Sequence, residues 1–272
     1  MVTKTDVQQA IQELGLANQP LCVHASLRSF GWVGGGADAI IDGVVAAGCT
    51  LLVPAFSDEF GVPPLPTMFR LQNGSDYEWA MRKAWPGIGK IYTPASTALE
   101  IAEMGAVPAA VVQRPDRQRG NHPLCSFAAV GPLAAVLVAT QAPLAVNAPL
   151  VTLAELQGYV VLMGVGLESM TLLHLAEQHA GRNLFRRWAN DQHGETIEVE
   201  MGGCSDGFGK LATFLEPLMT EIVVGQSHWR VFPAQETLTV AAEAIQRDPR
   251  LTHCGRSPCR CDDAVLGGPL LS

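Results

Sequence analysis

The chain has 272 residues, a length that suits one large domain or two small domains with a buried core. Hydrophobic residues make up 48% of the sequence and charged residues only 16%, which excludes general disorder because such a chain can bury enough apolar surface to fold. The formal net charge of −8 argues against nucleic acid as the main partner, since phosphate binding needs a surplus of cations. An acidic surface agrees better with a small cationic ligand, although it also serves plain solubility.

The cysteines and the apolar runs bear on location. There are 7 cysteines, an odd number that favours free thiols in a reducing compartment. The first residues contain no apolar signal segment, and no apolar run reaches the ~20 residues of a membrane-spanning helix. We therefore expect a cytoplasmic protein without a membrane or nucleic-acid partner. A homodimer is one of the oligomeric states that the sequence leaves open.

The first predicted elements form a strand–helix–strand unit. Residues 21–25 and 50–54 are short apolar runs that predict buried strands. Between them, residues 37–47 show the helical spacing of apolar side chains, and Gly48 follows as a C-terminal cap. This order indicates a parallel α/β arrangement. Residues 57–94 are rich in proline and aromatic residues, so we expect a long irregular insertion on the substrate side.

The second half of the chain continues with alternating elements. We predict a helix over 96–104 with a capping box from Thr97 to Glu100, a polar loop over 114–122, and a strand over 126–130. Further helices are expected at 132–140, 152–156, 169–180, 208–218 and 236–247, and strands at 159–163 and 195–200. No linker interrupts the sequence. The expected fold is α/β, with a central mixed sheet flanked by helices, in a single domain over residues 1–272.

Residues 163–179 are the most informative segment for chemistry. An apolar strand, a Gly-x-Gly turn and a helix place Thr171, His174 and Glu177 three residues apart. They follow the carboxyl end of a strand, where open α/β sheets bind their ligands. A carboxylate beside an imidazole fixes its tautomer and makes it a better general base. The alternative is an ordinary His–Glu pair on a helix surface.

Other motifs carry weaker signals. The glycine-rich loop over 26–36 could hold a phosphate, but it matches neither G-x-G-x-x-G nor a P-loop, and a flexible turn is the alternative. The sequence contains no G-x-S-x-G, C-x-x-C or H-E-x-x-H motif. The tail His253-Cys254…Cys259-Arg260-Cys261-Asp262 could bind a metal, but its spacing fits no common structural zinc site. We therefore expect no metal and a thiol-bearing segment packed on the surface.

Taken in order, several segments resemble the aminoglycoside 3-N-acetyltransferase family. The first two are Val23-His24-Ala25-Ser26-Leu27-Arg28-Ser29-Phe30-Gly31 and Val33-Gly34-Gly35-Gly36-Ala37-Asp38. Near the middle lie Asn121-His122-Pro123-Leu124-Cys125-Ser126-Phe127 and Thr171-Leu172-Leu173-His174-Leu175-Ala176-Glu177. Residues 50–56, 162–166, 225–227, 230–235 and 259–262 match as well, so the likeness spans roughly residues 18–264. Two departures stand out: Ala25 replaces a second serine, and residues 147–150 replace a Gly-x-x-Ser-Pro-Leu segment.

The resemblance implies transfer of an acetyl group from acetyl-coenzyme A to the 3-amino group of an aminoglycoside, an antibiotic-resistance activity. It implies that His174 is the catalytic imidazole, with Glu177 as its partner. We place Thr171 or the backbone amides of 26–31 as oxyanion donors. The resemblance also places the coenzyme against the loop after the first strand, and the residues assigned to it are His24, Ser26, Leu27, Arg28, Ser29, Phe30, Gly31, Val33, Gly34 and Ser126.

A cationic substrate needs carboxylates to accept charge-assisted hydrogen bonds. Candidates for one acidic cleft are Asp58, Glu59, Asp76, Glu78, Glu100, Glu103 and Asp206, with His122 as a further substrate contact. For any single acid, a solvated surface position is the alternative. Two rival functions remain open: acetylation of another small amine metabolite, and non-catalytic binding of coenzyme A or another ligand.

Overall fold

The computed structural model describes residues 1–271 and is built on a mixed sheet of seven strands in the order β3-β4-β2-β1-β5-β9-β8. Strand β1 pairs in parallel with both β2 and β5, whereas all other pairs are antiparallel. The predicted mixed sheet is therefore confirmed. The strands are β1 Pro20–Ala25, β2 Thr50–Phe56, β3 Gln118–Arg119, β4 Cys125–Val130, β5 Tyr159–Met163, β8 Thr220–Val224 and β9 Ser227–Pro233.

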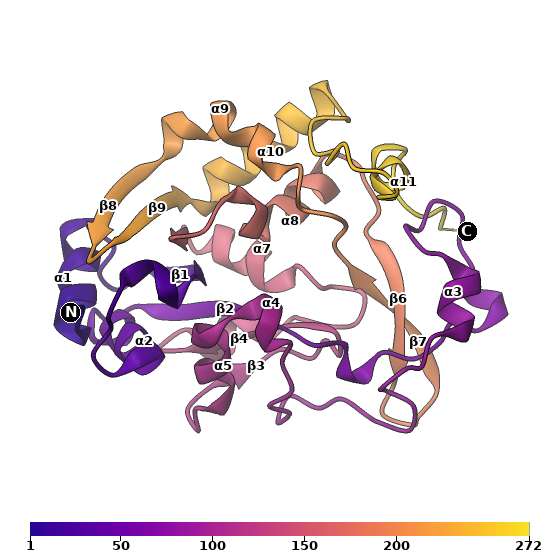
Figure 1. Cartoon of the computed structure of the whole chain (residues 1–272), viewed down its shortest axis with the longest axis horizontal. Helices are drawn as coiled ribbons and strands as arrows, with labels where there is room; N and C mark the ends of the chain where they lie inside the picture. The colour runs from indigo at the N-terminus through magenta and orange to yellow at the C-terminus, as the bar shows by residue number, and fades with distance from the viewer. Residues whose placement is uncertain (272) are drawn as a thin grey trace.

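Helices cover both faces of this sheet because alternate side chains of its buried strands point to opposite sides. Leu21 and Val23 of β1 pack in a core with α1 (Lys4–Glu13), α2 (Gly36–Ala46) and α5 (Ala106–Gln113). Cys22, between them, belongs to the opposite core. That core contains helices α6 Ala134–Val138, α7 Ala148–Glu155, α8 Leu172–His179, α9 Ala212–Leu215 and α10 Ala234–Arg247. Figure 1 shows α7, α8 and α10 together on one side and α2 and α5 on the other.

A second, two-stranded sheet lies at the far end of the molecule from the N-terminus (Figure 1). It is an antiparallel hairpin of β6 (Phe185–Asn190) and β7 (Thr196–Met201). The irregular segment 57–94 packs on it through a hydrogen bond from the backbone N–H of Val62 to the carbonyl of Trp188, 3.0 Å. The segment contains only short helices: η2 Asp58–Phe60, η3 Pro66–Met68 and α3 Tyr77–Arg82. The prediction of a long irregular excursion is therefore confirmed.

Two predicted helices differ from the structure. Residues 96–100 are not helical, and α4 (Ile101–Met104) begins only after Glu100, so the predicted capping box is wrong. The reason is a competing contact: the backbone N–H of Glu100 donates to the carbonyl of Phe56, 2.8 Å away at the end of β2. Residues 208–218 form η5 (Phe208–Leu211), α9 and η6 (Glu216–Leu218) instead of one helix. Sequence analysis did not predict α1, α5, β6, β8, β9 or α11 (Cys261–Val265), and it assigned the residues of β3 to a polar loop.

Among the helices of residues 1–271, none is both long and apolar enough to cross a bilayer.

His122 is a buried structural residue of the loop that enters β4. Its side chain is fully buried, and Nδ1 accepts hydrogen bonds from the backbone N–H groups of Leu124 (3.3 Å) and Cys125 (2.8 Å). Burial lowers the pKa of His122 from 6.5 to about 4. Because the pKa is lower in the folded state, the unfolded chain takes up a proton first as the pH falls. The free energy of unfolding therefore decreases as the pH falls from 6.5 towards 4, because protonation of the imidazole favours the unfolded chain over this range.

We predict that His122→Gln weakens the acid sensitivity of folding. Glutamine keeps an acceptor near the two N–H groups but has no proton to gain. Between pH 6.5 and 4, the free energy of unfolding should fall less steeply in the variant, by up to about 1.4 kcal/mol per pH unit. Urea titrations at a series of pH values measure this slope, and His193→Gln, at an exposed position, is the matched control. Equal slopes for the wild type and His122→Gln would contradict the assignment.

Candidate active site

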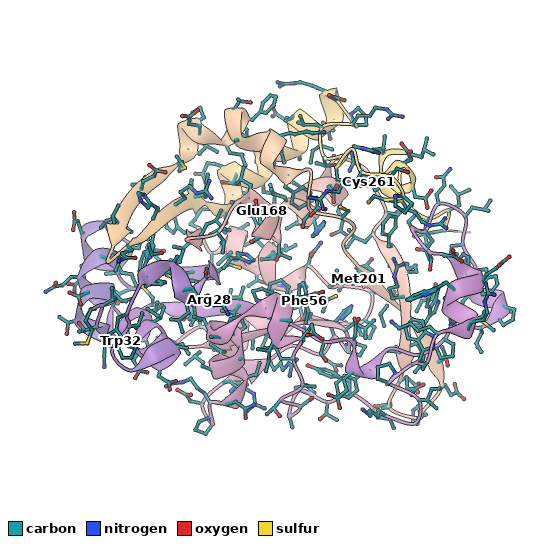
Figure 2. All side chains as sticks on the ribbon, viewed as in Figure 1. Arg28, Trp32, Phe56, Glu168, Met201 and Cys261 are labelled. Atoms are coloured by element: carbon teal, nitrogen blue, oxygen red, sulfur yellow. The ribbon has the colours of Figure 1, made fainter. Side chains whose placement is uncertain are left out.

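A cavity of about 270 Å³ opens where the parallel strands β1 and β2 end, next to the segment that leads from β5 into α8. This is the position at which open α/β sheets bind ligands, as the sequence predicted. Figure 2 labels Phe56, from the end of β2, and Glu168, from the segment after β5, on two sides of this region. The cavity is lined by Val23, His24, Ala25, Pro54, Phe56, Glu103, Met104, Pro108, Val165, Glu168, Ser169, Met170, Thr171, His174, Ser205 and Phe208.

His174 brings an imidazole to this cavity from the first turn of α8. Its side chain is 12% exposed, and Nδ1 lies 3.0 Å from the Oε2 atom of Glu177, one helical turn further along. An ionised carboxylate only accepts hydrogen bonds, so Nδ1 carries the proton. Among residues 1–271, no group hydrogen-bonds to Nε2. When the ring is neutral, Nε2 is therefore its acceptor nitrogen, which is the form a general base requires.

Glu177 is held in turn by two buried donors. Its side chain is 6% exposed, and its Oε1 atom accepts from Arg182 (2.6 Å) and from the hydroxyl of Thr252 (2.9 Å). A buried carboxylate is costly unless a cation and hydrogen bonds compensate it. Arg182 supplies that charge, and each oxygen of the carboxylate thereby has a defined partner. The orientation of His174 is thus fixed through Glu177 by Arg182, just after α8, and by Thr252 from the segment after α10.

The other face of the imidazole packs against the segment that follows β7. The ring of Phe208 meets the ring of His174 edge-on, with centroids 4.9 Å apart. Gly202 approaches closely, because a Cβ atom at this position would lie 2.6–2.8 Å from three atoms of the imidazole. Only a residue without a side chain allows this approach. The segment after β7 therefore closes over His174 and leaves it one orientation.

The loop after β1 is fixed beside the end of β5. Ser29 donates from its hydroxyl to the carbonyl of Ser26 (2.7 Å) and accepts from the hydroxyl of Ser227 (2.7 Å). Gly164, with φ +69°, makes this possible, since a Cβ there would lie 2.1 Å from the Ser29 hydroxyl. Ser26 lines an open groove together with Glu168 and Arg230. Val165, Glu168 and Ser169 line both the groove and the cavity, so the two spaces are neighbours.

Of the residues assigned to the coenzyme, His24 lies on the cavity and Ser26 on the groove. His24 is buried, and burial lowers its pKa to about 4, so its imidazole is neutral. The others do not line either space in the described chain: Leu27, Arg28, Ser29, Phe30, Gly31, Val33, Gly34 and Ser126. Arg28, which Figure 2 labels, is exposed.

Two of those side chains, Phe30 and Ser126, have structural roles in the protein interior. Phe30 is 1% exposed and packs edge-on against Trp229. Ser126 is buried in β4, where its hydroxyl accepts from Arg119 (2.9 Å) and donates to the carbonyl of Ala55 (3.0 Å). The structure therefore gives both residues a packing role, and neither is brought to the groove.

The structure does not bring most of the predicted substrate acids to the cavity. Glu59 pairs with Lys90 (3.0 Å), Glu78 with Arg82 (3.2 Å) and Asp206 with Arg256 (2.7 Å). Asp58 and Glu100 are exposed, and Asp76 caps α3 by accepting from the backbone of Trp79. These acids lie outside because each faces solvent or a nearby cation. His122 is likewise remote from the cavity because its ring is buried among backbone groups.

Two carboxylates do line the cavity. Glu103, one of the predicted acids, comes from α4. Glu168 was missed by sequence analysis, although it follows the Gly164-Val165-Gly166 turn at the end of β5. Its Oε1 atom accepts from the backbone N–H of Gly166, 3.0 Å. Sequence analysis would have included Glu168 if it had treated every polar residue just after a parallel strand as a site candidate.

The fold and the site together define a class of protein: an α/β enzyme with a histidine–carboxylate pair at a small-molecule cavity. Residues 22–246 match the sequence profile of the Antibiotic_NAT family, described as aminoglycoside 3-N-acetyltransferase. The match covers most of the chain. The chain therefore belongs to the aminoglycoside 3-N-acetyltransferase family, a family of acyltransferases, and the resemblance seen in the sequence is confirmed.

Individual relatives agree with this membership. An aminoglycoside N(3)-acetyltransferase III from Salmonella sp is 34% identical, and the match covers 95% of this chain and 94% of the relative. An aminoglycoside N(3')-acetyltransferase-like protein, YokD, from Bacillus subtilis is 32% identical over 64% of each chain. Among solved structures, the apoenzyme of aminoglycoside acetyltransferase AAC(3)-IVa superposes with a TM-score of 0.75 at 26% identity. That superposition covers 98% of this chain and 97% of the other.

We predict that Glu177→Gln destabilises the protein far more than an equivalent change at the surface. The substitution leaves Arg182 buried without a counter-charge, which costs about 3–5 kcal/mol. In Glu243→Gln, the exposed pair with Arg247 is lost instead, and this should change stability by at most about 1 kcal/mol. Urea unfolding of both variants measures the difference. Similar stabilities for the two variants would show that the buried pair does not hold the site together.

Proposed function

We propose that this protein transfers the acetyl group of acetyl-coenzyme A to the 3-amino group of an aminoglycoside. The observation that carries the proposal is the Glu177-oriented imidazole of His174 at the cavity of a member of this family. One relative in structure, a histidine-to-alanine mutant of AAC(3)-IVa at 25% identity, is described in complex with a gentamicin. That description supports an aminoglycoside as the acceptor.

In the proposed reaction, the acetyl group passes directly from sulfur to nitrogen. The Nε2 atom of His174 takes a proton from the amine as its nitrogen attacks the thioester carbonyl carbon. A C–N bond forms, the carbonyl oxygen gains negative charge, and the C–S bond then breaks. Coenzyme A leaves as a thiolate, which the imidazolium can protonate. Glu177 stabilises the imidazolium while it carries the proton.

The negative charge on the carbonyl oxygen needs donors, and Thr171 is placed to be one of them. It lies at the N-terminus of α8, lines the cavity, and its hydroxyl makes no hydrogen bond within residues 1–271. The positive end of a helix dipole adds a favourable field at this point. The backbone N–H groups of residues 26–31 remain the alternative donors that the sequence suggested.

The groove beside the loop after β1 suits the coenzyme. It shares Val165, Glu168 and Ser169 with the cavity, so a coenzyme bound along it would place its thioester near the cavity that His174 lines. Arg230 lines the groove and offers a cation for a phosphate group. We keep the assignment of Leu27, Arg28, Ser29 and Gly31 as neighbours of the coenzyme, through backbone as well as side chains.

The location of the protein is also a proposal. No disulfide joins the cysteines of the described chain, and Cys22, Cys49 and Cys125 are buried free thiols. Unpaired cysteines are typical of a reducing compartment. This supports the cytoplasm, where acetyl-coenzyme A would also be the co-substrate.

The function is tested by incubating the protein with acetyl-coenzyme A and a panel of aminoglycosides and other amines. Release of free thiol and the mass of the acetylated product are followed together. Thiol release with an acetylated aminoglycoside supports the proposal. Thiol release only with other small amines would show that the acceptor is not an aminoglycoside. Binding of the coenzyme without thiol release would indicate a non-catalytic protein.

We predict that His174→Ala lowers turnover by about 10²–10⁴-fold, because general base catalysis typically contributes that much. The matched control is His179→Ala, which removes an exposed imidazole from the same helix and should leave turnover unchanged. Steady-state rates of thiol release measure both. An unchanged turnover in His174→Ala would remove this residue from the mechanism.

We predict that Glu103→Gln raises the KM for a multiply charged aminoglycoside about tenfold, the loss expected for one charge-assisted hydrogen bond at an open site. The KM for acetyl-coenzyme A should not change, and Glu78→Gln, on the exposed side of α3, serves as the control. Added salt should raise the aminoglycoside KM of the wild type, since screening weakens this attraction. A KM that is independent of both salt and Glu103 would refute an acidic acceptor site.

A further inference from the structure

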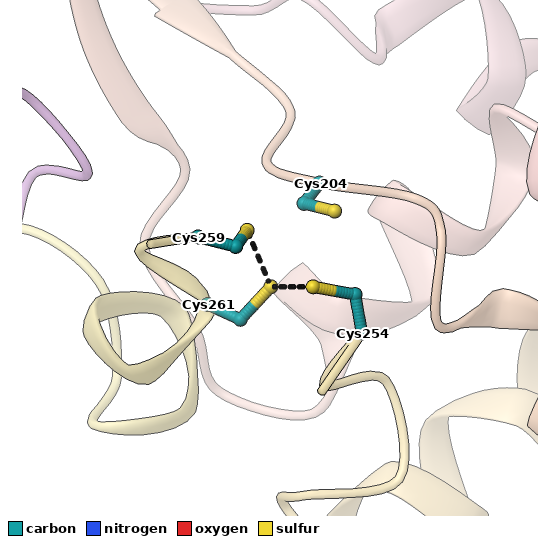
Figure 3. A group of neighbouring side chains, drawn as sticks. All are labelled: Cys204, Cys254, Cys259 and Cys261. Carbon is teal, nitrogen blue, oxygen red and sulfur yellow. Dashed lines mark hydrogen bonds between the residues drawn. The ribbon is translucent and has the colours of Figure 1, made fainter. Parts of the chain in front are cut away.

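Four cysteines from two distant parts of the chain meet at one point, outside the cavity. Cys204 follows β7, whereas Cys254, Cys259 and Cys261 belong to the segment after α10. Their four Sγ atoms all lie within 4.8 Å of one another. Figure 3 shows the side chains converging from the two segments. Such convergence of four soft ligands at one point is typical of a metal site and not of surface thiols.

The sulfur–sulfur distances suit a bound metal ion better than a disulfide. Cys259 and Cys261 have their Sγ atoms 3.1 Å apart, and those of Cys261 and Cys254 are 3.4 Å apart (Figure 3). A disulfide would bring them to ~2.05 Å. Four thiolates at ~2.3 Å from a tetrahedral zinc ion are ~3.8 Å apart along each edge. The two observed distances lie between the disulfide length and this value, and all four Sγ atoms lie within 4.8 Å of one another.

We propose that Cys204, Cys254, Cys259 and Cys261 bind one Zn²⁺ ion as a closed, structural site. All four positions of the tetrahedron come from the protein, so the ion has no open position for a substrate. Each thiol that binds the ion releases its proton to solvent. The zinc ion would therefore take no part in the chemical steps of acetyl transfer.

Hydrogen bonds and ion pairs surround the cluster. The cationic residues of this segment, Arg250, Arg256 and Arg260, pair with Asp262, Asp206 and Asp76. The backbone N–H of Arg256 donates to the Sγ atom of Cys254, 3.4 Å, as outer hydrogen bonds do for metal-bound thiolates.

Polar contacts join the same two segments on either side of the cluster. Arg256 pairs with Asp206 at 2.7 Å, and the ammonium group of Lys210 donates to the carbonyl of His253 at 2.6 Å. The segment after β7 and the segment after α10 are thus joined by non-covalent contacts next to the cysteines. The ligand positions are therefore held in place by contacts that do not depend on the ion.

The two segments that the ion would join are those that hold the catalytic pair. Thr252, which donates to Glu177, lies two residues before Cys254. Gly202, which closes against the ring of His174, lies two residues before Cys204. A zinc ion would therefore act as a positioning element for His174 and Glu177. It would fix the distance between their supports without touching the reacting atoms.

This inference departs from the expectation that the sequence supported. The spacing of the three tail cysteines fits no common zinc motif, and the fourth ligand, Cys204, is far upstream. Only the folding of the tail onto the segment after β7 completes the set.

Metal content tests the proposal without reference to activity. Wild-type protein, purified under reducing conditions and analysed by plasma mass spectrometry, should contain about one zinc ion per chain. Cys254→Ser and Cys259→Ser should each lose most of it. Cys49→Ser is the matched control, because its buried thiol donates to the carbonyl of Leu16, which serine can also do, and its zinc content should be unchanged.

A second measurement on the wild-type protein tests the zinc site even if a cysteine variant fails to fold. Wild-type protein from which the metal has been removed and replaced by Co²⁺ should show the strong thiolate-to-cobalt absorption of a sulfur site. Loss of zinc should also lower the Tm, and adding Zn²⁺ back should restore it. Zinc bound to a protein without acetyltransferase activity would leave this proposal standing and refute only the proposed function.

Three results would overturn the zinc site. The first is wild-type protein with no bound metal and no Co²⁺ absorption under reducing conditions. The second is a mass lower by two hydrogens per disulfide among these cysteines in the protein as purified. The third is iron in place of zinc, which would assign the four thiolates to a redox centre.

Discussion

The hydrogen bond between the Nδ1 atom of His174 and the carboxylate of Glu177 is the interaction on which the site depends. It leaves Nε2 as the acceptor at the cavity, and the rest of the surrounding structure serves to keep it in place. Arg182 and Thr252 hold the other oxygen of Glu177, and Gly202 closes against the ring. A helix-borne pair separated by three residues is common, but a pair supported from two other segments is a built site. This is why the alternative of an ordinary surface pair does not describe the structure.

The sheet determines where this pair can act. Parallel pairing of β1 with β2 and β5 brings three carboxyl ends to one edge, and the segment after β5 leads directly into α8. The cavity and the groove both open at that edge. In the proposed reaction, this surface would receive the thioester from the side of the loop after β1 and the amine from the side of Glu103. The hairpin β6–β7 and the irregular segment 57–94 extend the molecule beyond the sheet (Figure 1).

Local patterns in the sequence predicted what depends on local structure. The unit over residues 20–56 and the strand–turn–helix around His174 follow from apolar periodicity and from glycine caps, and both agree with the structure. What failed depended on contacts between distant segments. The backbone of Glu100 pairs with the end of β2 instead of starting a helix, and the substrate acids are distributed by tertiary packing that composition does not encode. The hydrogen bond from Thr252 to Glu177 and the approach of Cys204 to the tail cysteines also join distant segments, so local sequence patterns could not predict them.

The tautomer of His174 is the most direct test of this account. In ¹⁵N-labelled protein at a pH where the ring is neutral, the two ring nitrogens have distinct chemical shifts according to which carries the proton. The signal is assigned by its absence in the spectrum of His174→Ala. The account predicts a protonated Nδ1 and a bare Nε2. A protonated Nε2, which could not accept a proton from the amine, would contradict it.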